Sequence, residues 1–190
     1  MNIVDKFMLS REVVIKEGEI KMDKQRVIIL PIDFIGLYTL KFNNKQLAPK
    51  LYESMKSGMI DYSVPIGKEY GLSYRDYLDR WVKYCAFGGW GIVSYKLVET
   101  DGIPHGIVEI KGLPLHMYLK SKGITEASSD PLFDGLIAGS LSTTFKTNID
   151  IIEAKCICAG DESCIYYWGN KEYLIKNFPR LAAKRFGDIK

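Results

Sequence analysis

The stretch EAKCICAGDESC, which runs from Glu153 to Cys164, holds three of the four cysteines of this 190-residue chain. β-Rich runs flank it, over residues 149–158 and 163–168, and the Ala-Gly-Asp-Glu sequence between them is typical of a turn. Gly160 or Asp161 can adopt the positive φ that such a turn requires. We therefore expect an antiparallel hairpin here, as part of a larger sheet.

This hairpin has the residue types of a metal site. A three-residue turn over 159–161 would set Cys156 directly opposite Cys164, with Cβ atoms about 4.5–5.5 Å apart. Two thiolates on one tetrahedral zinc ion lie roughly 3.8 Å apart, which this spacing allows. Glu153 is a third candidate, but it projects to the opposite face of a regular strand unless a bulge turns it. A fourth ligand must come from elsewhere, because the hairpin has no histidine.

The same cysteines have a plain structural interpretation. Cysteine is a common small buried residue, so Cys156, Cys158 and Cys164 could line the core face of the sheet. Without a Cys-x-x-Cys pair, the spacing alone favours this interpretation over zinc. A disulfide between Cys156 and Cys164 is geometrically feasible but is not expected in a reducing compartment.

The rest of the chain alternates strand pairs with helices. The expected strands are 12–16, 26–30, 92–99 and 106–110; the expected helices are 34–59, 73–84, 114–122, 130–147 and 171–186; and the expected loops include 17–25 and 61–71. Asp130-Pro131 fits an N-cap followed by proline in the first turn. Hairpins joined by helices predict an α+β fold, with helices packed against an antiparallel β-sheet.

Composition limits the classes of partner. The chain is 47% hydrophobic and 26% charged, and 26 basic against 23 acidic residues give a net charge of +3. That balance predicts a globular protein without a nucleic-acid-binding surface. The longest apolar stretch, Val27 to Leu40, is interrupted by Pro31 and Asp33 and is too short for membrane insertion. With no secretory signal at its start, the chain is expected to be cytoplasmic.

Catalytic groupings are sparse. There is no Gly-x-Ser-x-Gly elbow, phosphate loop or dinucleotide fingerprint. Of the two histidines, His105 is expected to be solvated; His116 could face a pocket, bind haem or lie at the surface, and the surface position is favoured over haem ligation. A binding module is favoured over an enzyme. The basic side of the last helix is expected to face solvent; it carries Lys171, Lys176, Arg180, Lys184 and Arg185.

The sequence also resembles a known family. Gly135-Leu-Ile-Ala-Gly139, Glu153-x-x-Cys156, Gly160-Asp161 and Cys164 together are similar to the vinyl-4-reductase domain family. That family includes sensory domains of phenol- and xylene-responsive activators, and its fold is related to TRAPP subunits and haem nitric-oxide sensors. The similarity is clearest over residues 107–168. The two β-rich runs at the start predict an N-terminal β-arm or hairpin over 1–33, and the resemblance implies a ligand-binding domain over 34–190.

The resemblance also implies a structural zinc site. In the aromatic sensors of the family a glutamate and three cysteines hold the ion, and Glu153, Cys156 and Cys164 match three of these positions. The remaining cysteine falls on Asp130, which would either bind zinc or act only as an N-cap. Cys158 matches no ligand position and is expected in the core.

Finally, the resemblance implies a closed hydrophobic pocket between the helices and the sheet. The candidate wall residues are Tyr84, Trp90, Phe133, Leu136, Gly139 and Phe145. The implied function is a sensor or carrier of a small apolar or aromatic molecule, often as a homodimer. A subunit of a reductase acting on an unsaturated hydrocarbon group and a ligand-free assembly subunit are the alternatives.

Overall fold

A four-stranded antiparallel sheet forms the centre of the computed structural model, which describes residues 13–22, 25–42, 44, 46–70, 73–100, 102–125 and 130–187. Its strand order is β4-β5-β7-β6. The strands are β4 (Ile92–Thr100), β5 (Ile103–Lys111), β6 (Asp150–Lys155) and β7 (Ser163–Gly169). Because every neighbouring pair is antiparallel and the connection from β5 to β6 contains helices, the predicted α+β fold is confirmed.

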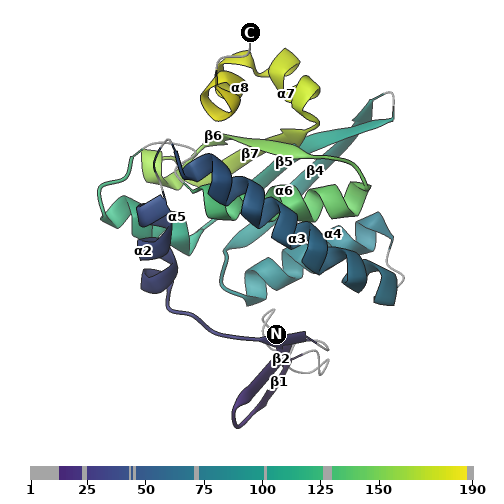
Figure 1. The fold of residues 1–190 in the computed structure, drawn as a ribbon, viewed down its shortest axis with the longest axis vertical. Coiled ribbons are helices and arrows are strands. Elements are labelled where there is room, and N and C mark those ends of the chain that lie inside the picture. The colour runs from purple at the N-terminus through teal and green to yellow at the C-terminus, as the bar shows by residue number, and fades with distance from the viewer. Residues whose placement is uncertain are drawn as a thin grey trace.

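Two long helices, α3 (Ala48–Tyr70) and α6 (Pro131–Phe145), cross in front of the sheet in Figure 1. They pack closely because two glycines of α6 face α3. A Cβ on Gly135 would lie 2.6 Å from the Tyr52 carbonyl oxygen, and one on Gly139 would lie 2.5 Å from that of Lys56. Both distances are shorter than van der Waals contact, so any larger residue would push the helices apart.

The core lies between α6 and the sheet. On the sheet side, Tyr166 and Trp168 of β7 are fully buried beside Val108 and Ile110 of β5. Aromatic rings close both ends of this layer. Trp90 stacks on Phe133 with ring centroids 5.2 Å apart, and Phe145 stacks on Trp168 at 5.1 Å.

Other helices surround this layer. They are α2 (Ile32–Phe42), α4 (Tyr74–Phe87), α5 (Pro114–Ser121), α7 (Lys171–Asn177) and α8 (Pro179–Phe186). The helices α4, α5 and α6 confirm the predicted ones, and Ser73 and Asp130 cap α4 and α6 as N-cap residues. Among the helices of the described residues, none combines the length and the apolar character needed to cross a membrane.

Three predictions about helices were wrong. The expected helix 34–59 is divided, because the Asn44 side chain accepts hydrogen bonds from the backbone N–H groups of Gln46 and Leu47 and so starts α3 separately. The expected loop 61–71 is helical as far as Tyr70, despite Pro65 and Gly67. The expected helix 171–186 is broken at Pro179, which lacks the N–H that a continuous helix requires.

The N-terminal segment forms a separate small sheet. It contains three strands, β1 (Val13–Lys16), β2 (Glu19–Met22) and β3 (Gln25–Val27), joined in an antiparallel meander. The prediction of a polar loop over 17–25 was therefore wrong, because Glu19–Met22 pairs with both neighbouring strands. Figure 1 shows this meander projecting away from the helices and the main sheet.

Candidate metal centre

A bulge in β6 decides which side chains face inward at the end of the sheet. Glu153 pairs with Tyr166, whereas Lys155 pairs with Ile165, so Ala154 is an extra residue in the ladder. In a regular strand, residues 153 and 156 point to opposite faces. The extra residue brings Glu153 and Cys156 to the same face, as the sequence analysis required for both to reach one ion.

The turn after β6 then positions the second thiol. β6 ends at Lys155, and a short 3₁₀ turn (Ile157–Ala159) leads to Gly160, whose φ of +102° is the positive value expected there. The Asp161 carboxylate accepts a hydrogen bond from the Cys156 backbone N–H at 2.8 Å. The Ile157 backbone N–H donates to the Cys164 sulfur at 3.4 Å, which keeps this thiol beside Cys156.

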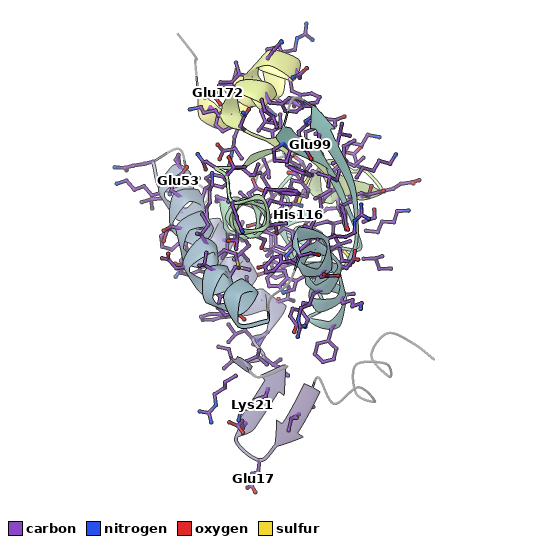
Figure 2. The ribbon with its side chains drawn as sticks, turned by 90° about the vertical axis from the view of Figure 1, so that its right-hand side faces the viewer. Glu17, Lys21, Glu53, Glu99, His116 and Glu172 are labelled. Atoms are coloured by element: carbon purple, nitrogen blue, oxygen red, sulfur yellow. The ribbon has the colours of Figure 1, made fainter. Side chains whose placement is uncertain are left out.

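His116 of α5 completes the cluster. It is fully buried, so the expectation of a surface position was wrong, and Figure 2 shows it in the interior of the molecule. Its Nδ1 atom lies 3.1 Å from Cys164 Sγ and 3.2 Å from Cys156 Sγ. The same nitrogen lies 3.4 Å from Glu153 Oε1.

Three groups thus approach a single ring nitrogen. An imidazole nitrogen carries either one proton or one lone pair, so it cannot form good hydrogen bonds to two sulfur atoms and a carboxylate at once. A cation between the four groups would satisfy all of them. One ligand atom from each of His116, Glu153, Cys156 and Cys164 lies within 4.8 Å of the others. Tetrahedral zinc, with bonds of about 2.0–2.3 Å, holds its ligand atoms roughly 3.3–3.8 Å apart, so the cluster could hold a metal ion.

Two further residues border the cluster. Asp130, a candidate ligand from the sequence, is not one of the four; its Oδ1 atom accepts the Phe133 backbone N–H at 3.1 Å as an N-cap. Its Oδ2 atom lies behind the ring, 3.5 Å from His116 Nε2. Cys158 is buried in the core, as predicted, and its thiol donates to the His116 backbone carbonyl.

Burial and neighbouring charges shift the acidities of this region. Burial lowers the pKa of His116, but the contacts to Asp130, Cys156 and Glu153 raise it by a larger amount. The pKa of His116 therefore lies well above its ordinary value. Burial and the charges of Glu153 and Asp134 raise the pKa of Tyr166. Metal binding at this cluster would require the neutral form of His116 and would therefore depend on pH.

A second buried polar cluster lies beside the first. The Asp150 carboxylate accepts hydrogen bonds from Lys56 Nζ at 2.6 Å and from the Tyr52 hydroxyl at 2.8 Å. Arg185 of α8 pairs with Asp134 at 3.4 Å and lies over the Tyr52 ring, 3.8 Å from its centroid. Its side chain is only 10% exposed, so the expectation that Arg185 belongs to a solvated face was wrong.

The predicted pocket residues do not share one environment. Trp90 and Phe133 stack on each other, Leu136 is partly buried against the core, and Gly139 faces α3. The Tyr84 hydroxyl accepts a hydrogen bond from Arg80. Phe145 borders a cavity of about 140 Å³, which is also lined by Gly102, Ile103, Pro104, Thr147, Ile149 and Asn170.

His116 was not predicted to be a member of the site, and the predicted position of His105 was wrong. His105 is 8% exposed and packs against Tyr173 in a tilted arrangement, with ring centroids 4.2 Å apart, so it is not solvated. For His116 the pattern of α5 contained a signal: Leu115 and Leu119 of the same short helix are both fully buried. A histidine beside apolar residues of such a helix is well placed to face inward.

Comparison with known proteins bears on the fold. No family model and no curated protein sequence matches the chain. Among solved structures, the phenol-responsive sensory domain of the transcription activator PoxR, crystallised with phenol, is similar, with a TM-score of 0.71 and 15% sequence identity. The similarity covers 99% of this chain and 96% of that one.

Two other structures are less similar. A vinyl-4-reductase family protein from Methanocaldococcus jannaschii has a TM-score of 0.49 at 16% identity, covering 75% of this chain and 82% of that one. Subunit 3 of a trafficking protein particle complex from Naegleria fowleri, covalently bound to palmitic acid, has a TM-score of 0.47 at 13% identity, covering 73% and 89%. The chain therefore has the fold of the PoxR sensory domain, which is the fold that the sequence resemblance predicted.

Proposed function

We propose that this chain is a sensory or carrier domain that binds a small apolar or aromatic molecule and is braced by a structural zinc ion. The observation that carries the proposal is the convergence of four buried metal-ligand atoms, from three separate elements, at the end of the sheet. The similarity of fold to a phenol-responsive sensory domain supports the ligand-binding part.

The donor set favours zinc over other common ions. Two thiolates, an imidazole and a carboxylate are ligands that zinc accepts in tetrahedral geometry, whereas calcium and magnesium prefer oxygen. Four protein ligands leave no open coordination position, which is typical of structural rather than catalytic zinc. Thiolates persist in a reducing compartment, so the proposal places the protein in the cytoplasm.

Metal analysis of protein purified without chelator tests the zinc. We expect about one zinc per chain by native mass spectrometry, and loss of the ion in Cys156→Ser, Cys164→Ser and His116→Gln. Cys85→Ser is the matched control, because Cys85 is buried outside this cluster and its pKa is raised by burial to about 12. Metal-free protein whose stability equals that of protein refolded with zinc would contradict the proposal.

The cavity next to Phe145 offers one candidate ligand site. A second position beside α6 would require the stacked rings of Trp90 and Phe133 to separate. The cavity beside Phe145 has a volume of about 140 Å³ and is partly open to solvent, whereas the engineered cavity of about 150 Å³ that binds benzene in another protein is closed and apolar.

Titration calorimetry with phenol and toluene tests the ligand. Thr147→Trp should fill the cavity beside Phe145 from its exposed rim, so binding that survives this change lies beside α6, and binding that is lost lies in the cavity. If neither probe binds, the sensor proposal fails, and a ligand-free assembly subunit is the better description. Turnover of an unsaturated substrate by the isolated chain would instead favour the reductase alternative.

We also propose that the protein is a homodimer. The segment before α2 and α2 itself expose apolar side chains, with Ile29 77% and Phe34 61% exposed. A second copy would cover this surface and support the projecting meander, since a small sheet without a core is only marginally stable. Ile29→Asp with Phe34→Asp should yield a monomer by light scattering. The control is Ile92→Asp, at an isoleucine 71% exposed on β4, and a monomeric wild-type protein would refute the proposal.

A further inference from the structure

Asp130 presents its two carboxylate oxygens to different partners. Oδ1 accepts the Phe133 backbone N–H and caps α6, while Oδ2 faces His116 Nε2 at 3.5 Å. The side chains of Asp130 and His116 are both fully buried. Within the part of the chain that the structure describes, neither Oδ2 nor Nε2 has another hydrogen-bond partner, so each is the available partner of the other.

The two nitrogens of His116 therefore have separate roles. Nδ1 faces Cys156, Cys164 and Glu153 at 3.1–3.4 Å, on the side where an ion would sit. When Nδ1 binds a metal, the neutral ring carries its proton on Nε2. That N–H then points toward Asp130 Oδ2, and histidine ligands commonly donate their second N–H to a carboxylate.

We propose that Asp130 is a positioning residue for the metal centre: it holds His116 with Nδ1 directed to the ion, and it is not itself a ligand. This inference rests on the proposed metal site. Asp130 lies behind the ring, on the side away from Nδ1, and is absent from the set of four ligand atoms. One side chain thus joins the start of α6 to the ring of α5, so the capped helix fixes the orientation of the ligand.

The test uses Asp130→Asn, which keeps the shape and the N-cap but loses the charge and the second carboxylate oxygen. Zinc affinity, measured by chelator competition, should fall about 10–100-fold, as expected for loss of such a carboxylate partner. At saturating Co²⁺ the visible spectrum should stay that of four-coordinate cobalt with two thiolates. Asp130→Ser, which also caps a helix but cannot reach Nε2, should show the same loss.

Ser73→Ala is the matched control for helix capping, because Ser73 caps α4 away from the cluster. It should lower stability and leave zinc affinity unchanged. Unchanged affinity in both Asp130 variants would overturn the inference and leave Asp130 as a cap only. A changed spectrum at saturating Co²⁺ would overturn it in favour of direct ligation. A wild-type protein that binds neither Zn²⁺ nor Co²⁺ would refute the proposed metal site itself, and the positioning role with it.

Discussion

The interior holds two clusters of buried polar side chains, and they differ in how their charges are balanced. In the Asp150 cluster, formed by Tyr52, Lys56, Asp134, Asp150 and Arg185, each carboxylate faces a lysine or arginine from a different element of the fold. In the His116 cluster, formed by His116, Glu153, Cys156 and Cys164, all four groups are ones that bind cations.

This difference teaches what each cluster needs in order to be stable. A buried charge is tolerated when an opposite charge and hydrogen bonds accompany it. The Asp150 cluster obtains these from the protein itself, by joining α3, α6, α8 and β6. We propose that an ion completes the His116 cluster, and the following predictions test that contrast.

The largest effect is expected from metal removal. Structural zinc in small peptides contributes about 10–16 kcal/mol of binding energy, which is coupled to folding. Chelation should therefore lower the unfolding midpoint of the zinc-loaded protein by more than about 10 °C, by differential scanning calorimetry. An unchanged unfolding midpoint after chelation would show that the His116 cluster, like the Asp150 cluster, is stable without a metal ion.

Lys56→Met should produce the next largest effect. It leaves Asp150 buried beside Tyr52 without its cation, and breaking a buried ion pair in this way costs about 3–5 kcal/mol. Denaturant unfolding measures the loss. Zinc affinity should be unchanged, because Lys56 is not part of the His116 cluster; a fall in both would mean that the clusters are not independent.

Asp134 makes the contribution of the Asp150 cluster to stability depend on pH. Burial raises the pKa of Asp134 from 3.8 to about 7, although the Arg185 charge opposes this rise. The folded protein therefore binds this proton more tightly than the unfolded chain, so this contribution is fully present below about pH 4 and declines as pH rises through about 7. In Asp134→Asn the loss of stability between pH 5 and pH 8 should become smaller, as measured by urea unfolding across this range. An equal slope in both proteins would contradict the prediction.

Tyr52→Phe should have the smallest effect. It removes the hydroxyl that donates to Asp150 at 2.8 Å but keeps the ring beneath Arg185. A hydrogen bond to a charged acceptor contributes about 1.5–3 kcal/mol, and the remaining contact with Lys56 should keep the loss near the lower value. Thermal unfolding of the variant measures it. A loss as large as that of Lys56→Met would mean that the hydroxyl, rather than the ammonium group, balances Asp150.

The sequence was most informative where structure is set by neighbours along the chain. The cysteine hairpin, the Asp130 cap and the positive φ at Gly160 all follow from local patterns, and each is present. From the sequence, a bulge was known to be needed if Glu153 and Cys156 were to share one face of the sheet. Its position at Ala154 could not be predicted, because no residue type marks it.

What remained hidden depends on contacts between distant segments. His116 reaches the hairpin only because α5 folds over it, 40 residues away from Cys156 along the chain. Arg185 is similar: its charge predicts exposure, yet Asp134 and the Tyr52 ring draw it inward. The length of α3 was also misjudged, since packing against α6 outweighs the helix-breaking tendency of Pro65 and Gly67.

Because of the bulge at Ala154, Glu153 and Cys156 share one face of the sheet although they are three positions apart along the chain. If Ala154 were instead paired in a regular ladder between β6 and β7, hydrogen bonding along the edge would improve. Yet the thiol would then swing to the far side of the sheet and leave the carboxylate behind. The irregular pairing of β6 with β7 is therefore what allows the carboxylate and the thiol to meet on one face of the sheet.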